Sequence, residues 1–145
     1  MKKRTRIMAI DDEEEILRLL KNILEGEGYD FWGATSGDAA FSLWRECPPD
    51  LLILDIMMPG LDGFQVLNLI RRKSDVPVIM LTGRGEVTAL RDCVELGADD
   101  YIRKPFYPLE LVARVRAKLR RVAQSLPVSD RCEEIACEKV VNNNE

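Results

Sequence analysis

Histidine is absent from the sequence, and its four cysteines are scattered rather than paired. They are Cys47, Cys93, Cys132 and Cys137. Because imidazole is missing and no two thiols have the spacing of a metal or redox motif, the usual ligands for zinc and haem are lacking. The most common side chain for general acid–base catalysis is lacking as well. We expect the cysteines to be reduced, partly buried apolar residues.

Long hydrophobic runs are also absent near the N-terminus. The basic residues 1–6 are followed by an apolar run at 7–10, which is far too short for a signal-peptide core or a membrane span. We therefore expect a cytoplasmic protein without membrane contact. The net charge of −4, with 32% charged residues, is unlike that of a general nucleic-acid binder, so DNA contact would need a separate module.

Apolar runs alternate with segments of helical periodicity along most of the chain. With 145 residues, 46% of them hydrophobic, the sequence suits one compact domain with a linker or tail. Predicted strands cover 6–10, 29–34, 51–54, 76–81 and 101–102. Predicted helices cover 14–25, 36–47, 64–72, 86–96 and 109–122. The alternation predicts an α/β fold, a doubly wound five-stranded parallel sheet with five helices on its two faces.

Polar side chains stand where the predicted strands end. Asp11 and Asp12 follow the first strand, and Asp55 follows the buried run LLIL. Thr82 follows the fourth strand, and Lys104 follows the fifth. The carboxyl ends of parallel strands meet at one edge of a doubly wound sheet, beside the switch in strand order. We therefore expect these five side chains to converge on one site.

Each of these residues also has an ordinary structural explanation when it is taken alone. Asp12 followed by Glu15 resembles a helix cap with a reciprocal acidic partner. Asp55 and Thr82 could each begin a turn, and Lys104 could be an ordinary solvated lysine. A shared location at one edge of one sheet favours a functional site over four unrelated structural roles.

The charges of the cluster indicate what it binds. Three carboxylates within ~5 Å of one another repel by ~3 kcal/mol per pair at an effective dielectric constant near 20. Lys104 balances only one of the three charges. The remaining charge suits a hard divalent cation with oxygen ligands, and Mg²⁺ fits because it takes one or two carboxylates and also accepts phosphate oxygens.

Five segments resemble the receiver domain of two-component response regulators (CheY-like), in the OmpR/PhoB subgroup. They are IMAIDDE, LLILDIMMPGLDGF, VIMLTGR, ELGADDYIRKPF and ELVARVRAKLRR, in this order, within about residues 5–121. The resemblance implies the flavodoxin-like strand order 2-1-3-4-5. It also implies a cis peptide bond between Lys104 and Pro105.

The same resemblance assigns roles to the site residues. It implies that Asp55 accepts a phosphoryl group from the phosphohistidine of a sensor histidine kinase, which would explain why this chain needs no histidine. Asp11 and Asp12, with Asp55 and the backbone carbonyl of Met57, would hold Mg²⁺. Lys104 would bind the phosphoryl oxygens. The chain would thus be a regulator that assists its own phosphorylation and dephosphorylation, and not an enzyme.

The resemblance further implies an output surface made by the fourth helix, fifth strand and fifth helix. Thr82 and Tyr101 would be the switch pair that changes this surface, which then forms a homodimer on phosphorylation. The charged residues expected at the interface are Asp99, Asp100, Arg114, Arg116 and Arg120. A solvated basic helix face is the alternative for the arginines. The subgroup's charged pair on the fourth helix is missing, because Ala89 and Leu90 stand there.

The composition changes after the last predicted helix. We expect a receiver domain at 1–122, a linker at 123–131 and a tail at 132–145. The tail resembles the start of the winged-helix effector domain of the subgroup, so DNA would be bound only through a domain that is incomplete here; a tail that packs elsewhere is the alternative. A stand-alone receiver is disfavoured by the subgroup match. A phosphatase of the haloacid-dehalogenase type is disfavoured because it needs an acid where Met57 stands.

Overall fold

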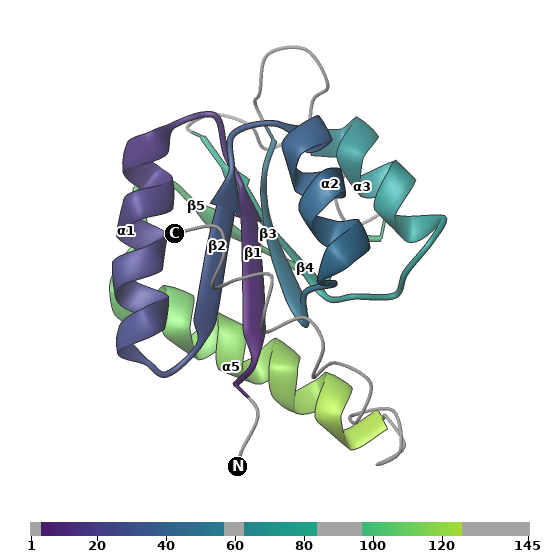
Figure 1. Ribbon diagram of the computed structural model, residues 1–145. Helices are drawn as coiled ribbons and strands as arrows, with labels where there is room; N and C mark the ends of the chain where they lie inside the picture. The colour runs from purple at the N-terminus through teal and green to yellow at the C-terminus, as the bar shows by residue number, and fades with distance from the viewer. Residues whose placement is uncertain (1–3, 57–62, 84–96, 126–145) are drawn as a thin grey trace.

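The computed structural model describes residues 4–56, 63–83 and 97–125. Strands and helices alternate along these segments (Figure 1). The strands are β1 (Arg6–Ile10), β2 (Asp30–Ala34), β3 (Leu51–Asp55), β4 (Val78–Thr82) and β5 (Asp100–Arg103). The helices are α1 (Glu14–Gly26), α2 (Gly37–Glu46), α3 (Gly63–Arg71) and α5 (Pro108–Ser125). The helix predicted at 86–96 lies outside the described residues.

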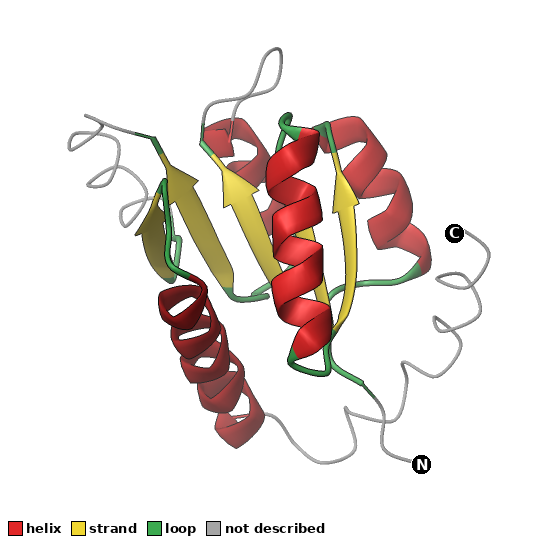
Figure 2. Ribbon diagram, turned by 90° about the vertical axis from the view of Figure 1, so that its left-hand side faces the viewer, coloured by secondary structure: helices red, strands yellow, loops and turns green. Residues whose placement is uncertain are grey.

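The five strands form one parallel sheet in the order β2-β1-β3-β4-β5, which confirms the predicted topology. Figure 1 shows the sheet between α1 on the left and α2 and α3 on the right, and Figure 2 looks onto the side that carries α1 and α5. Helices therefore cover both faces, as in a doubly wound α/β fold. No helix in the described segments is long and apolar enough to cross a membrane.

The strand sequences explain why the sheet is buried on both faces. Every residue of β1, β3 and β4 is buried, as continuous apolar runs require. Alternate side chains point to opposite faces, so Met8 and Ile10 of β1 pack with Val66 and Leu67 of α3 in one core cluster. Strand residues that point to the opposite face, such as Ile7, Ala9 and Ile53, form a second core cluster with α1 and α5. The helix residues of this cluster include Leu20, Leu24, Leu111 and Val115.

The helix starts show which sequence signals act as caps. Ser36 caps α2 as expected, because its Oγ accepts a hydrogen bond from the Ala39 amide at 3.2 Å. At α1 the N-cap residue is Glu13, and its side chain makes no capping hydrogen bond. The explanation of Asp12 as a helix cap is therefore wrong. The Asp11 side chain stabilises this turn instead, because its Oδ1 accepts a hydrogen bond from the Glu13 amide at 2.9 Å.

Two element boundaries differ from the predicted ones by more than one residue. β4 begins at Val78 rather than 76, because Pro77 has no amide hydrogen to donate to a ladder. α5 runs to Ser125, beyond the expected end at 122 and into the expected linker. Residues 126–145, which include the rest of the linker and the whole tail, lie outside the described residues.

Candidate functional site

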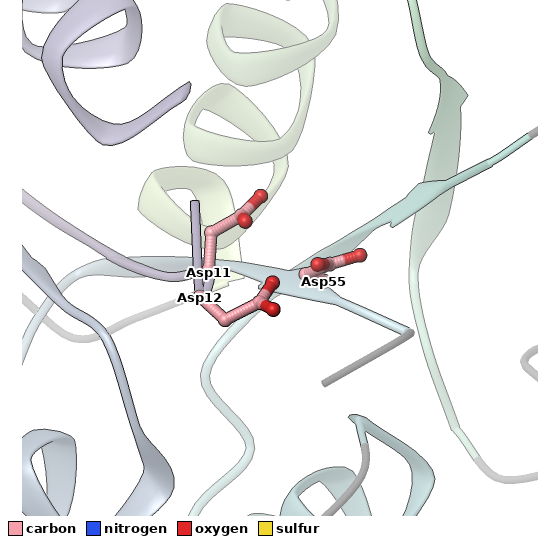
Figure 3. Close-up of side chains that lie close together, drawn as sticks. All are labelled: Asp11, Asp12 and Asp55. Carbon is pink, nitrogen blue, oxygen red and sulfur yellow. The ribbon is translucent and has the colours of Figure 1, made fainter. Parts of the chain in front are cut away.

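Three aspartates meet at the carboxyl edge of the sheet. Asp11 and Asp12 follow β1, and Asp55 is the last residue of β3, the strand beside β1. Because Ile10 pairs with Leu54, Asp11 and Asp55 are the next residues along two neighbouring strands. One carboxylate oxygen from each aspartate lies within 4.8 Å of the others. Figure 3 shows the three side chains close together. The predicted convergence of these side chains is confirmed.

The three carboxylates differ in burial. Asp11 has an exposed fraction of 0% and Asp55 of 3%, whereas Asp12 is exposed. Backbone hydrogen bonds hold the buried pair in place, since the Asp11 amide donates to Ala34 O at 3.1 Å and the neighbouring Ile56 amide donates to Leu81 O at 3.1 Å. Burial of charged groups is costly unless they are paired, so the site needs cations.

Lys104 supplies one cation from the end of β5. Its Nζ lies 2.9 Å from Asp11 Oδ2, 3.4 Å from Asp55 Oδ2 and 3.7 Å from Glu13 Oε1. Burial alone would lower the pKa of Lys104, but the hydrogen bond to Asp11 and the charges of Asp55, Asp11 and Glu13 outweigh burial and raise it. The explanation of Lys104 as a solvated lysine is therefore wrong. The cis peptide bond to Pro105 is confirmed.

Glu13 is a site residue that the sequence did not reveal. Its position in the acidic run DDEEE was visible, but the run gave no sign that Glu13, rather than Glu14 or Glu15, lies beside Lys104. The side chain of Glu13 is 60% exposed, so water screens its charge more than the charges of the buried aspartates.

Thr82 and Tyr101 lie where the switch residues were expected. Thr82 is the last residue of β4 and is buried, and it follows Leu81, the partner of Asp55 in the sheet. Tyr101 lies on β5 opposite Met80 of β4 and has an exposed fraction of 38%. One residue is thus buried at the acidic edge, and the other reaches solvent from the adjacent strand.

Four of the five expected interface residues make ion pairs within the chain. Arg114 Nη1 lies 2.8 Å from Asp100 Oδ1, and this hydrogen-bonded pair is the main cause of the raised pKa of Arg114. Asp99 pairs with Arg71 of α3 at 2.9 Å, not with α5. Arg116 pairs with Glu27 at the end of α1. Arg120 is exposed on α5.

The donor set of the cluster fits Mg²⁺. All the groups are carboxylate oxygens, which hard divalent cations prefer, and two of the three carboxylates are buried. The three aspartates face one partly buried ammonium group, that of Lys104, so the local charge balance remains negative. Met57, the fourth expected ligand, lies outside the described residues.

Fold and site together define a receiver domain, in which an acidic cluster lies at the carboxyl edge of a 2-1-3-4-5 sheet. The chain belongs to the response regulator receiver domain family, which matches residues 7–116. The OmpR/PhoB-type assignment agrees with its relatives. The chain is 42% identical, over 98% of its length, to the DNA-binding response regulator MtrA of Mycobacterium leprae. It is 50% identical, over 81% of its length, to the probable transcriptional regulator ycf27 of Porphyridium aerugineum.

The chain spans 65% of the length of that MtrA protein and 49% of the length of that ycf27 protein. Solved structures of receivers are similar as well. A putative response regulator from Chloroflexus aurantiacus superposes with a TM-score of 0.78 at 36% identity, and the match covers 81% of this chain and 99% of that one. NtrX from Brucella abortus superposes with a TM-score of 0.81 at 30% identity, over 88% of this chain and 29% of that one.

Proposed function

We propose that Asp55 is the phosphoryl acceptor of this receiver and that the donor is the phosphohistidine of a sensor histidine kinase. The observation that carries the proposal is the position of the Asp55 carboxylate, at the end of a buried strand, within 4.8 Å of two other carboxylates and 3.4 Å from the Lys104 ammonium. A rigid strand end fixes the direction of the nucleophile, and the surrounding charges suit a phosphoryl group bound with a cation.

The transfer itself needs little more than positioning and charge. An Asp55 oxygen attacks the phosphorus in line while the bond from phosphorus to the imidazole nitrogen breaks, and the electron pair of that bond stays on the leaving imidazole. Lys104 can turn from Asp55 to the phosphoryl oxygens, which carry the negative charge. The Thr82 hydroxyl, at the same edge, donates a hydrogen bond to one of them.

Asp11, Asp12 and Asp55 would hold Mg²⁺, with the Met57 carbonyl as a further ligand. When bound, Mg²⁺ neutralises charge on the phosphoryl oxygens during transfer. The same groups assist hydrolysis of the acyl phosphate when water reaches the phosphorus. The relatives are response regulators and not conventional enzymes, which agrees with an acceptor that promotes its own modification and its reversal.

The signal would leave the site through Thr82 and Tyr101. If the Thr82 side chain moves toward the phosphoryl group, the space that it leaves becomes available to the ring of Tyr101, which is now partly in solvent. Tyr101 belongs to β5, so this movement changes the surface made by β5 and α5. Phosphorylation thus selects one of two arrangements of the same residues.

The changed surface would pair with a second copy of the chain. Asp100 and Arg114 lie at this surface and are paired with each other within one chain, so dimerisation requires them to share or exchange partners. The output would be regulation of transcription in the cytoplasm, through a DNA-binding domain beyond a receiver at 1–122. The names of the longer relatives, a DNA-binding response regulator and a probable transcriptional regulator, support this output.

Incubation with acetyl phosphate and Mg²⁺, followed by mass spectrometry, tests the proposal. We expect one added phosphoryl group on the unaltered protein and none on Asp55→Ala. Asp38→Ala, which alters an acidic residue in the first turn of α2, is the matched control and should be labelled normally. Undiminished labelling of Asp55→Ala, or of the unaltered protein in excess chelator, would contradict the proposal.

A further inference from the structure

β5 carries Tyr101 and ends directly before Lys104, yet its side chains contribute little to the buried core. Among the strands that the structure describes, it lies at the edge of the sheet and pairs with β4 alone. Of its four residues only Ile102 is buried. The register of a strand is set mainly by its buried face, so one buried side chain specifies the register of β5 poorly. Other contacts must fix where this strand begins and ends.

Arg71, the last residue of α3, makes such contacts. Its Nε donates to Gly97 O at 2.9 Å, just before β5, and its Nη2 donates to Asp99 Oδ2 at 2.9 Å. Its Nη1 donates to Ser74 O at 3.3 Å and to Val76 O at 2.6 Å, in the segment that leads into β4. One guanidinium thus joins the end of α3 to the segments that precede both strands.

Asp99 transmits this anchoring to the sheet. Its Oδ2 also accepts a hydrogen bond from the Val78 amide at 2.8 Å, and its own amide donates to Val78 O at 2.9 Å. Asp99 is therefore fixed against the first residue of β4. At the other end of the strand, the Lys104 amide donates to Thr82 O at 2.7 Å, the last residue of β4. The ladder between β4 and β5 is held at both ends.

We propose that Arg71 is a positioning residue for phosphorylation: through Asp99 it fixes the register of β5 and so places the Lys104 ammonium beside Asp55. This inference rests on the proposed function of Asp55. It assigns Asp99 to an anchor inside the chain rather than to the dimer interface. Lysine cannot replace Arg71 fully, because a single ammonium group cannot reach the separate acceptors that the planar guanidinium contacts at once.

The test compares Arg71→Ala and Arg71→Lys with Arg72→Ala, which removes the same charge from the exposed neighbouring position. We expect the rate of labelling by acetyl phosphate to fall roughly tenfold in Arg71→Ala, because misplacing a reacting group by about 1 Å can cost up to about a hundredfold. The labelling rate of Arg71→Lys should lie between those of Arg71→Ala and the unaltered protein. The labelling rate of Arg72→Ala should match that of the unaltered protein. The Lys104 amide should exchange faster with solvent in Arg71→Ala, while Mg²⁺ affinity and exchange in β1 and β3 stay unchanged.

A double variant decides whether Arg71 acts through Lys104. In a Lys104→Ala background, Arg71→Ala should cause little further loss of labelling. An equal loss in both backgrounds, or faster exchange spread over β1 and β3, would overturn the inference. Normal labelling of Arg71→Ala would also overturn it and would leave the proposed function intact. Absence of labelling in the unaltered protein would instead overturn the proposed function, and with it any role of Arg71 in phosphorylation.

Discussion

At the scale of single residues, the site shows how one residue type serves in three environments. Asp11 is buried against Lys104, Asp55 is buried at the end of β3, and Asp12 is exposed. Asp12 makes no ion pair with any residue that the structure describes. Without a metal ion its charge mainly repels the other two carboxylates. The acidic cluster is therefore kept at a cost in stability, which a bound cation offsets.

Asp12→Asn should raise the stability of the metal-free protein. The gain should be no more than about 1 kcal/mol, because Asp12 is exposed and water and salt screen its charge. Thermal unfolding with and without Mg²⁺ is the measurement. The variant should also lose most of the stabilisation that Mg²⁺ gives the unaltered protein. A lower melting temperature of the variant in chelator would show that repulsion does not dominate at this position.

Gly63 lies against the backbone of Asp55, the proposed acceptor. A Cβ at this position would lie 2.3 Å from the carbonyl oxygen of Asp55 and 2.7 Å from the Cα of Ile56. Both are backbone atoms, one of Asp55 and one of the residue directly after it, so neither can move without displacing Asp55. The Gly63 amide also donates to Ile56 O at 3.0 Å, which fixes the approach.

Gly63→Ala should therefore destabilise the protein by about 1–3 kcal/mol, as overpacking does, and should slow labelling of Asp55. Gly26→Ala is the matched control, because a Cβ there meets nothing within 4 Å. Denaturant unfolding measures the first effect, and mass spectrometry the second. Equal stability of the two variants would mean that α3 shifts freely away from β3.

At the scale of elements, the sequence predicted the presence and order of the strands better than the residues at which strands and helices begin and end. The runs in β1 and β3 were unambiguous because strands covered on both faces are continuously apolar. The five site residues were found for a related reason, since each stands next to a strand end. The contacts of Arg71 could not be predicted, because it reaches residues up to 28 positions away, and three of its acceptors are backbone carbonyls, which leave no sequence pattern. The role of Glu13 was hidden among identical neighbours.

Ser36→Ala should destabilise α2 and the protein by about 1 kcal/mol, because the Ala39 amide loses its acceptor at the helix start. Ser42→Ala in the same helix is the control. The Ser42 hydroxyl donates to Asp38 O within the helix, and its replacement by alanine should be neutral or slightly stabilising. Urea unfolding measures the free energy of unfolding of the two variants. A larger loss for Ser42→Ala would contradict the assignment of Ser36 as the cap.

At the scale of the whole molecule, the receiver is a buried sheet with an acidic cluster at its carboxyl edge and ion pairs on the side of β5 and α5. The parallel sheet and its two helical layers could be inferred from hydrophobic pattern alone, because few folds accommodate the alternation of strands and helices. The pairing of charged residues across the surface could not be inferred from the sequence. Asp99 and Asp100 are neighbours in sequence, yet one is held by α3 and the other by α5.

A beryllium fluoride mimic of phosphorylation should convert a weakly associating protein into a two-fold dimer through the β5 and α5 surface. Each exposed ion pair contributes only about 0.5–1 kcal/mol, and the pair already formed between Asp100 and Arg114 reduces the gain further. Association should therefore weaken as salt rises. Analytical ultracentrifugation with and without the mimic is the measurement.

Reversing the charges of Asp100 and Arg114 together should restore part of the dimerisation that either reversal loses alone. Because these residues also pair within one chain, the melting temperature of each monomer serves as a control for effects on folding. An unchanged mass with and without the mimic, in a protein that is labelled at Asp55, would show that this receiver signals without dimerising.

The neighbouring positions of β1 and β3 have a consequence for how such a protein can evolve. The backbones of Asp11 and of Asp55, the proposed acceptor, follow paired residues of two neighbouring strands, which lie about 4.8 Å apart, and no substitution can alter this spacing without breaking the ladder. The backbone spacing between Asp55 and Asp11 is thus a constant of the architecture. Selection for a longer or shorter memory of a signal has to act on the side chains that admit water to the bound phosphoryl group. The timing of the signal can change over generations while the acceptor itself stays the same.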